Sequence, residues 1–222
     1  GTTLDVRLAN GADLDEVNRL TFNHPGITAV PKTQDSGGQQ VPVDNTFVVT
    51  ISPDVPPGLY EARAAGYYAL PNPPTFVVGR QTEVQEAEAN NTPEQATPIE
   101  LDTVVNAAAG GGTDVDYYKF TATTGQRLII TCRAARIDSR MNATIELFDS
   151  SGRRLAHSRN DVRQDPLVDF TPEADGEYIV RVFDFTYGGG ADYFYRLSVG
   201  SKPHIDYIMP PAAPAGSTQT FT

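Results

Sequence analysis

Five side chains that offer oxygen atoms stand at alternate positions in two short segments of this sequence. Glu86, Glu88 and Asn90 form the first set, and Asp114 with Asp116 forms the second. In an extended backbone, residues two apart point to the same side, so each set can aim its oxygens together. Carboxylates mixed with an amide suit calcium, which takes roughly six to eight oxygen ligands. The spacing therefore predicts a calcium site built from these five residues.

A polar linker followed by a solvated strand would show the same residues, so the distribution of charge helps to separate the two interpretations. Residues 81–126 carry eight acidic side chains and one lysine, a net charge of −7 out of −11 for the whole chain of 222 residues. Crowded carboxylates repel one another, and a divalent cation removes that repulsion. The same acidity repels phosphates, so we expect no nucleic-acid partner.

The segment from about residue 83 to residue 200 also carries an ordered set of motifs. They are Glu86–Asn91, Asp114–Phe120, Gly125–Leu128, Ala143–Asp149, Ala174–Val182 and Tyr193–Leu197. Together they resemble the bacterial pre-peptidase C-terminal (PPC) domain, a small β-sandwich appended to secreted peptidases and other exported proteins. The resemblance implies a jelly-roll-like module that is not itself catalytic and that in some members binds calcium at the linker. By position, the five oxygen-bearing residues match that site.

One position departs from the pattern of this family. The family usually has proline between the second glutamate and the asparagine of the linker, and this chain has Ala89. Because proline fixes its own backbone, alanine leaves the linker less rigid before binding. We expect this difference to affect the affinity for calcium more than the existence of the site.

The rest of the pattern predicts an all-β protein. Short apolar runs alternate with many of the 17 prolines and 19 glycines, which is typical of strands joined by turns. The first eighty residues predict an immunoglobulin-like sandwich, and the turn Asp54–Tyr60 resembles IPT/TIG-type modules. Its expected strands are 3–8, 17–22, 46–51, 59–65 and 75–78. Eight further strands predict a jelly-roll-like β-sandwich, at 103–109, 115–122, 126–135, 143–149, 153–158, 166–171, 177–184 and 192–199.

This pattern divides the chain into an immunoglobulin-like domain at 1–80, an acidic linker at 81–101, a PPC-like domain at 102–201 and the start of a further repeat at 202–222. Residues 216–222 parallel residues 1–7, which suggests one period of a tandem array. We expect residues 203–210 to pair, by strand exchange, with an immunoglobulin-like domain of a neighbouring molecule, because unpaired sheet edges accept added strands.

Strand alternation also predicts the core of the second domain. The residues expected inside are Tyr118, Phe120, Leu128, Ile130, Ile145, Leu147, Tyr178, Val180, Val182, Tyr193, Tyr195, Leu197 and Val199. The only cysteine, Cys132, shares their side of its strand, so we expect a buried, inert thiol. Ile129, Phe148, Ile179, Phe183 and Phe194 are expected to face outward beside Arg133, Arg181 and Arg196. Aromatic residues beside arginine are favoured at interface centres, although scattered exposed apolar residues are also normal.

No catalytic motif stands out in the sequence. The three histidines lie far apart and do not form a metal or triad motif. We therefore expect no enzymatic activity, but a calcium-stabilised accessory or attachment module of a large exported protein, such as a secreted peptidase. Its partners would be other domains of the parent chain and a protein or polysaccharide ligand, without membrane insertion. The alternatives are a carbohydrate- or protein-binding β-sandwich and, behind it, a cryptic hydrolase with a carboxylate pair. An extracytoplasmic location follows from the resemblance.

Overall fold

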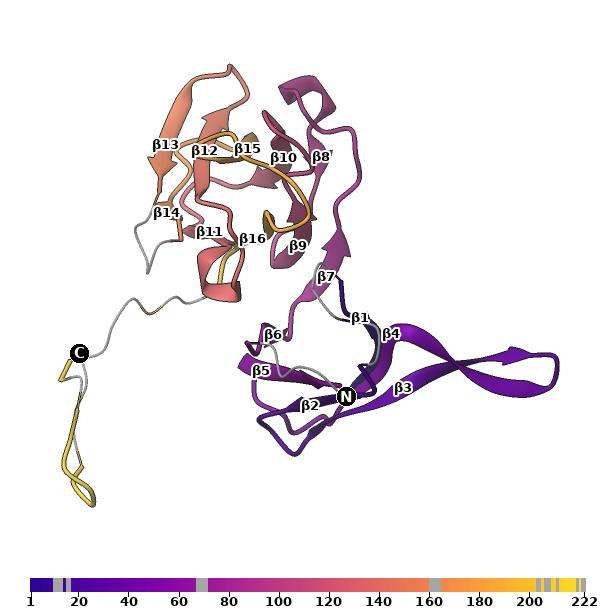
Figure 1. Cartoon of the computed structure of the whole chain (residues 1–222). Coiled ribbons are helices and arrows are strands. Elements are labelled where there is room, and N and C mark those ends of the chain that lie inside the picture. The colour runs from indigo at the N-terminus through magenta and orange to yellow at the C-terminus, as the bar shows by residue number, and fades with distance from the viewer. Residues whose placement is uncertain are drawn as a thin grey trace. The chain divides into compact units, whose positions relative to one another are not determined.

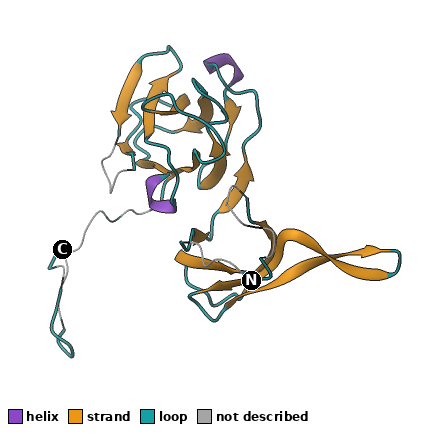
Figure 2. Ribbon diagram, viewed as in Figure 1, coloured by secondary structure: helices purple, strands orange, loops and turns teal. Residues whose placement is uncertain are grey.

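The computed structural model describes residues 1–9, 14, 17–66, 72–159, 165–202, 205, 209–210, 212–218 and 220. The chain separates into two compact units. Unit 1 comprises Gly1–Gln81 with Ile137–Arg140, and unit 2 comprises Thr82–Arg136 with Met141–Thr222. Almost all regular structure in the described residues is β-strand (Figure 2), as expected, and the helical residues form two single 3₁₀ turns, Pro93–Gln95 and Ala135–Ile137. Neither turn has the length or the apolar character of a membrane crossing, and no other described helix exists.

Unit 1 is a small sandwich of two three-stranded sheets, which agrees with the predicted immunoglobulin-like class. The order in one sheet is β1-β4-β3, and the order in the other is β2-β5-β6. Phe47 and Val49 of β4 lie at the centre of its core and are 1% and 0% exposed. The strands are β1 (Thr2–Arg7), β2 (Arg19–Phe22), β3 (Ile27–Ser36), β4 (Gln39–Ile51), β5 (Gly58–Ala65) and β6 (Thr75–Val78).

The β3–β4 hairpin was missed over most of its length by the strand prediction. Its distal half projects from the sheet (Figure 1) and is almost entirely exposed. Pro31 and Pro42 interrupt the apolar alternation there, and prolines argue against a central strand. The prolines are tolerated because this part is a two-stranded ribbon, with the register shifted between Pro31 and Thr33. Gly37 and Gly38 have positive φ values of 65° and 87° and make the turn at its tip.

Unit 2 is a sandwich of two five-stranded sheets (Figure 1), with the orders β13-β12-β15-β10-β8 and β14-β11-β16-β9-β7. All eight strands predicted for the jelly roll are present, with ends that differ by at most two residues. They are β9 (Thr103–Ala108), β10 (Val115–Ala122), β11 (Leu128–Arg133), β12 (Ala143–Asp149), β13 (Arg154–Ser158), β14 (Leu167–Phe170), β15 (Gly176–Asp184) and β16 (Phe194–Gly200).

Two further strands come from the segment that was expected to be a linker. β7 (Thr82–Gln85) pairs in parallel with β9, and β8 (Thr97–Pro98) pairs in parallel with β10. Both lie at sheet edges, where short polar strands are usual. Glu83 of β7 also forms an ion pair with Arg196 of β16, with 2.7 Å between Oε1 and Nη2. The acidic segment is therefore built into the sandwich.

The core of unit 2 lies between its two sheets and follows the predicted alternation. Of the residues expected inside, Tyr193 is partly buried and packs against the core, and all the others are buried. Phe194 is 37% exposed, as expected for an outward residue, whereas Phe183 is only 8% exposed. Phe183 does lie on the outer side of β15, but Tyr187 stacks on it at 5.5 Å and the Arg181 guanidinium lies 4.5 Å from its ring centre.

Cys132 is completely buried in this core. Burial raises the pKa of its thiol well above the usual value, and the charges of Asp165 and Asp116 raise it further. We expect a thiol reagent to leave the native protein unlabelled and to modify one thiol after unfolding, because the reactive thiolate is disfavoured and enclosed. Mass spectrometry of native and denatured samples checks this prediction, and rapid native labelling would contradict it.

The strand exchange expected for residues 203–210 falls largely outside the described residues. The described residues among them, Ile205, Met209 and Pro210, are not in a strand. The pairing with a neighbouring molecule therefore stays a prediction. Of the repeat at 216–222, Gly216–Thr218 and Thr220 are described, and they also lie outside strands.

Candidate functional site

The acidic segment runs beside the start of β10 and is held there by main-chain bonds. After β7 ends, the Glu86 amide donates to the Asn106 carbonyl of β9 at 2.9 Å. Four residues later, the Asn90 carbonyl accepts a hydrogen bond from the Tyr117 amide of β10, also at 2.9 Å. These two bonds fix both ends of the stretch that carries Glu86, Glu88 and Asn90. The predicted donors of the linker are thereby placed against the strand that carries Asp116.

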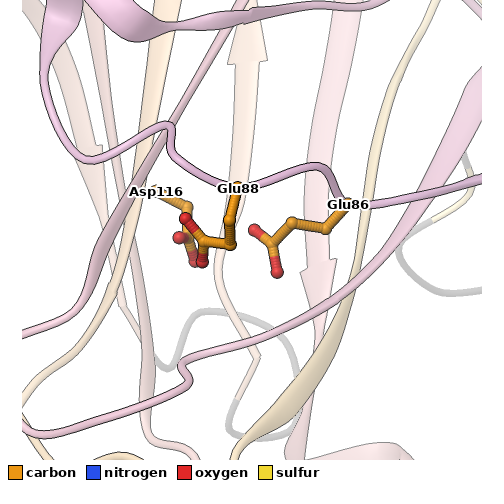
Figure 3. Close-up of side chains that lie close together, drawn as sticks. All are labelled: Glu86, Glu88 and Asp116. Atoms are coloured by element: carbon orange, nitrogen blue, oxygen red, sulfur yellow. The ribbon is translucent and has the colours of Figure 1, made fainter.

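Three carboxylates converge at this place. Glu86, Glu88 and Asp116 each offer an oxygen atom, and these three atoms lie within 4.8 Å of one another. Figure 3 shows the three side chains pointing toward a common space from two separate segments. Asp116 is completely buried and Glu88 is exposed, so the group reaches from the interior to the surface. Such a spacing of carboxylate oxygens fits the first coordination shell of a calcium ion.

Two buried oxygens at this group have no partner among the described residues. They are Oδ1 of Asn90 and Oδ1 of Asp116, and both residues are 0% exposed. The other end of the Asn90 amide is used, since Nδ2 donates to Glu86 Oε1 at 3.2 Å. A buried oxygen without a partner costs about 1–3 kcal/mol. A cation at this position would give both oxygens a ligand bond.

Asp114 is placed differently from the other predicted donors. Its Oδ2 accepts a hydrogen bond from the Gly110 amide at 2.6 Å, and its Oδ1 accepts one from the side-chain amide of Asn91 at 2.7 Å. Both oxygens are thus engaged in holding the loop before β10. Asp114 does not belong to the group of three converging carboxylates, although its charge still acts on them.

Two tyrosine hydroxyls complete the interior side of the site, and sequence reasoning assigned these residues only to the core. Tyr118 Oη donates to Glu86 Oε1 at 2.6 Å, and Tyr195 Oη donates to Asp116 Oδ2 at 2.6 Å. The two hydroxyl oxygens lie 2.7 Å apart. A buried tyrosine needs a hydrogen-bond partner. Two core tyrosines close to the predicted donors could therefore have indicated that their hydroxyls contact the site.

The electrostatics of the site favour a proton or a cation on its buried side. Burial raises the pKa of Asp116 to about 8, and the charges of Glu86, Asp114 and Glu88 add to the rise. The hydrogen bond from Tyr195 acts in the opposite direction and lowers this pKa. Burial, Asp114 and Glu86 also raise the pKa of Glu88. Three contacts of 2.6–2.7 Å join Asp116, Tyr195, Tyr118 and Glu86 in one continuous network.

A polar cleft of about 630 Å³ opens beside the exposed end of the site. Glu88 and Asp114 lie on its lining together with Tyr117 and Arg181, and the loop Gly110–Val115 forms much of the rest. The Arg181 guanidinium is held in place, because Nη1 donates to Glu146 at 3.0 Å and the group lies near the rings of Tyr117 and Phe183.

Two glycine triplets hold the loop that carries Asp114. Residues 110–112 follow β9 and residues 188–190 follow β15, and their backbones touch at Gly111 and Gly189. The Gly190 amide donates to the Ala109 carbonyl at 2.8 Å, and the Thr113 amide donates to the Tyr187 carbonyl at 3.1 Å. Both triplets are loops between strands, and Gly190 has a positive φ of 133° that only glycine adopts readily.

Residues 114–184 match the family model of the bacterial pre-peptidase C-terminal domain. Unit 2 carries a PPC domain. A probable subtilase-type serine protease of Deinococcus radiodurans is 30% identical over 102 residues, which are 45% of this chain and 14% of that protein. The chain therefore spans only a small part of the relative that it matches.

Two solved structures are similar to part of the chain. One is the PPC domain of a collagenase from Bacillus anthracis, with 25% identity and a TM-score of 0.41 over 50% of this chain and 99% of that one. The other is PliG of Aeromonas hydrophila, a periplasmic inhibitor of g-type lysozyme, with 15% identity and a TM-score of 0.34 over 54% of this chain and 95% of that one. The PPC domain is a non-catalytic accessory domain of secreted proteases.

Proposed function

We propose that this chain is a calcium-stabilised accessory module of an exported multidomain protein, in which the PPC domain serves for spacing, attachment or substrate docking beside a catalytic partner. The match to a segment of a subtilase-type protease supports a peptidase as the parent. An extracytoplasmic location follows from the same likeness. The calcium part of the proposal depends on the geometry of the acidic segment.

One observation carries the proposed calcium site. Three carboxylates converge where two buried oxygens, on Asn90 and Asp116, have no partner among the described residues. Glu86, Glu88, Asn90 and Asp116 would hold the ion, with main-chain carbonyls or water completing the shell. The donors are all oxygens, so the site does not suit metals that prefer thiolate or imidazole ligands. A bound calcium ion would neutralise the repelling carboxylates and would tie the acidic segment to β10.

Calorimetric melting of the whole chain tests this proposal. At a hundredfold excess over the dissociation constant, calcium that binds only the folded form stabilises it by about 2.7 kcal/mol. We expect the transition of unit 2 to rise by several degrees relative to chelator-treated protein, and to rise less with magnesium, which demands a smaller octahedral shell. Superimposable melts with calcium and with chelator would refute the calcium site.

A second candidate function is the binding of a carbohydrate or protein ligand by the PPC domain. The polar cleft beside the site favours it, because the cleft combines carboxylates with an aromatic ring and a fixed guanidinium. Clefts of roughly 300–1,000 Å³ are typical ligand sites. Replacing Tyr117 with alanine should weaken retention on an immobilised ligand if this cleft is used. Unchanged retention would exclude the cleft as the binding surface.

A further inference from the structure

Tyr118 and Tyr195 are fully enclosed, being 0% and 1% exposed, and their hydroxyls face the proposed calcium ligands. The Tyr118 hydroxyl donates to Glu86, and the Tyr195 hydroxyl donates to Asp116 and also lies 3.4 Å from Glu86 Oε1. The two strands that carry these tyrosines belong to opposite sheets of the sandwich. The hydroxyl pair therefore joins the two sheets directly behind the acidic segment.

Each hydroxyl occupies one oxygen of a carboxylate at the site. Tyr195 occupies Oδ2 of Asp116 and leaves Oδ1 without a partner. On Glu86, Tyr118 and the Asn90 amide occupy Oε1, while the Ala108 amide donates to Oε2 at 3.1 Å. An ionised carboxylate can rotate, and a fixed donor on one oxygen holds the other in one direction. Donors behind the ligands orient many metal sites in this way.

We propose that Tyr118 and Tyr195 are positioning residues of the calcium site, which act as one unit and set its affinity by presenting Oδ1 of Asp116 and the Glu86 carboxylate to the ion. This inference rests on the calcium site proposed above. Removing either hydroxyl frees a carboxylate to turn, and it also leaves a buried oxygen without its donor. Loss of such a donor typically lowers metal affinity 10–100-fold.

The test compares the calcium dissociation constants of Tyr118→Phe and Tyr195→Phe with that of the unmodified chain, by titration against a chromophoric chelator. Each phenylalanine keeps the ring that fills the core, so circular dichroism should show an intact fold. We expect each variant to bind calcium 10–100-fold more weakly. Because the hydroxyls act as a unit, the double variant should lose little more than either single variant.

Tyr178→Phe is the matched control. Tyr178 is buried in the same core, but its hydroxyl donates to the Ala174 carbonyl instead of a site residue. We expect this variant to melt at a lower temperature while its calcium dissociation constant stays unchanged. Calcium binding by the unmodified chain together with binding by both site variants within threefold would overturn the positioning role. Absence of binding by the unmodified chain would overturn the calcium site, and this inference with it.

Discussion

Replacing Asp116 with asparagine should abolish the stabilisation of unit 2 by calcium and at the same time make the metal-free protein more stable at pH 8 and above. The two effects have opposite signs because the same carboxylate is a ligand for the ion and, without the ion, a buried charge that neighbouring carboxylates repel. Asparagine keeps an oxygen that can accept from Tyr195, and it has no charge to bury. The loss of calcium stabilisation amounts to about 2.7 kcal/mol at a hundredfold excess over the dissociation constant.

The shifted pKa of Asp116 determines how the stability of the metal-free protein changes with pH. The pKa of Asp116 is raised to about 8 in the folded protein, mainly by burial, from about 3.9 in an unfolded chain. A raised pKa stabilises the folded form at low pH, and this stabilisation is lost as the pH rises through the folded pKa. Metal-free unmodified protein should therefore lose stability between about pH 4 and pH 8 by this contribution, and Asp116→Asn should not. Equal stability profiles of the two metal-free proteins across this range would contradict the assignment.

Replacing Gly189 with alanine should destabilise unit 2 by about 3 kcal/mol, near the upper end of what overpacking costs. A Cβ at this position would overlap the Gly111 carbonyl, and a backbone carbonyl cannot move aside as a flexible side chain can. The two glycine loops would have to separate, and the loop before β10 would shift with them. Urea unfolding measures the loss.

Gly111→Ala is the matched control for this substitution. Gly111 is the other partner in the same contact, yet a Cβ built on it meets nothing within 4 Å. We expect this variant to stay within about 0.5 kcal/mol of the unmodified protein, as surface substitutions usually do. If the two alanine variants are equally stable, the backbone contact between the glycine loops does not exist as described.

The strands of the PPC domain could be predicted because their alternation is regular and their turns carry glycine and aspartate. Leu128, Ile130 and Cys132 show the pattern, since each second residue of β11 faces the core. The β3–β4 hairpin could not be predicted in the same way, because a two-stranded ribbon without a core leaves no apolar alternation. The strands β7 and β8 were not predicted either, because they are short and polar and form only by adding to existing sheet edges.

The site shows the same division between local and long-range information. The alternate spacing of Glu86 and Glu88 placed two oxygens together, and the strand start placed Asp116 beside them. The orientation of Asp114 depends on a loop held by a second loop about 75 residues later, which no local pattern encodes. The hydroxyl of Tyr195 reaches Asp116 only because the two sheets pack face to face, and the two residues are 79 positions apart in the sequence.

The position of β7 has a mechanical consequence. Tension transmitted along the chain through Gln81 enters unit 2 at Thr82. Since β7 runs parallel to β9 and β16 runs antiparallel to it, Thr82 and the last residues of β16 lie at the same end of the sheet. A pull between them peels β7 away one residue at a time instead of shearing all its bonds together. The Glu83–Arg196 ion pair would break early. The carboxylates that follow β7 would be pulled last, and a bound ion would hold them to β10.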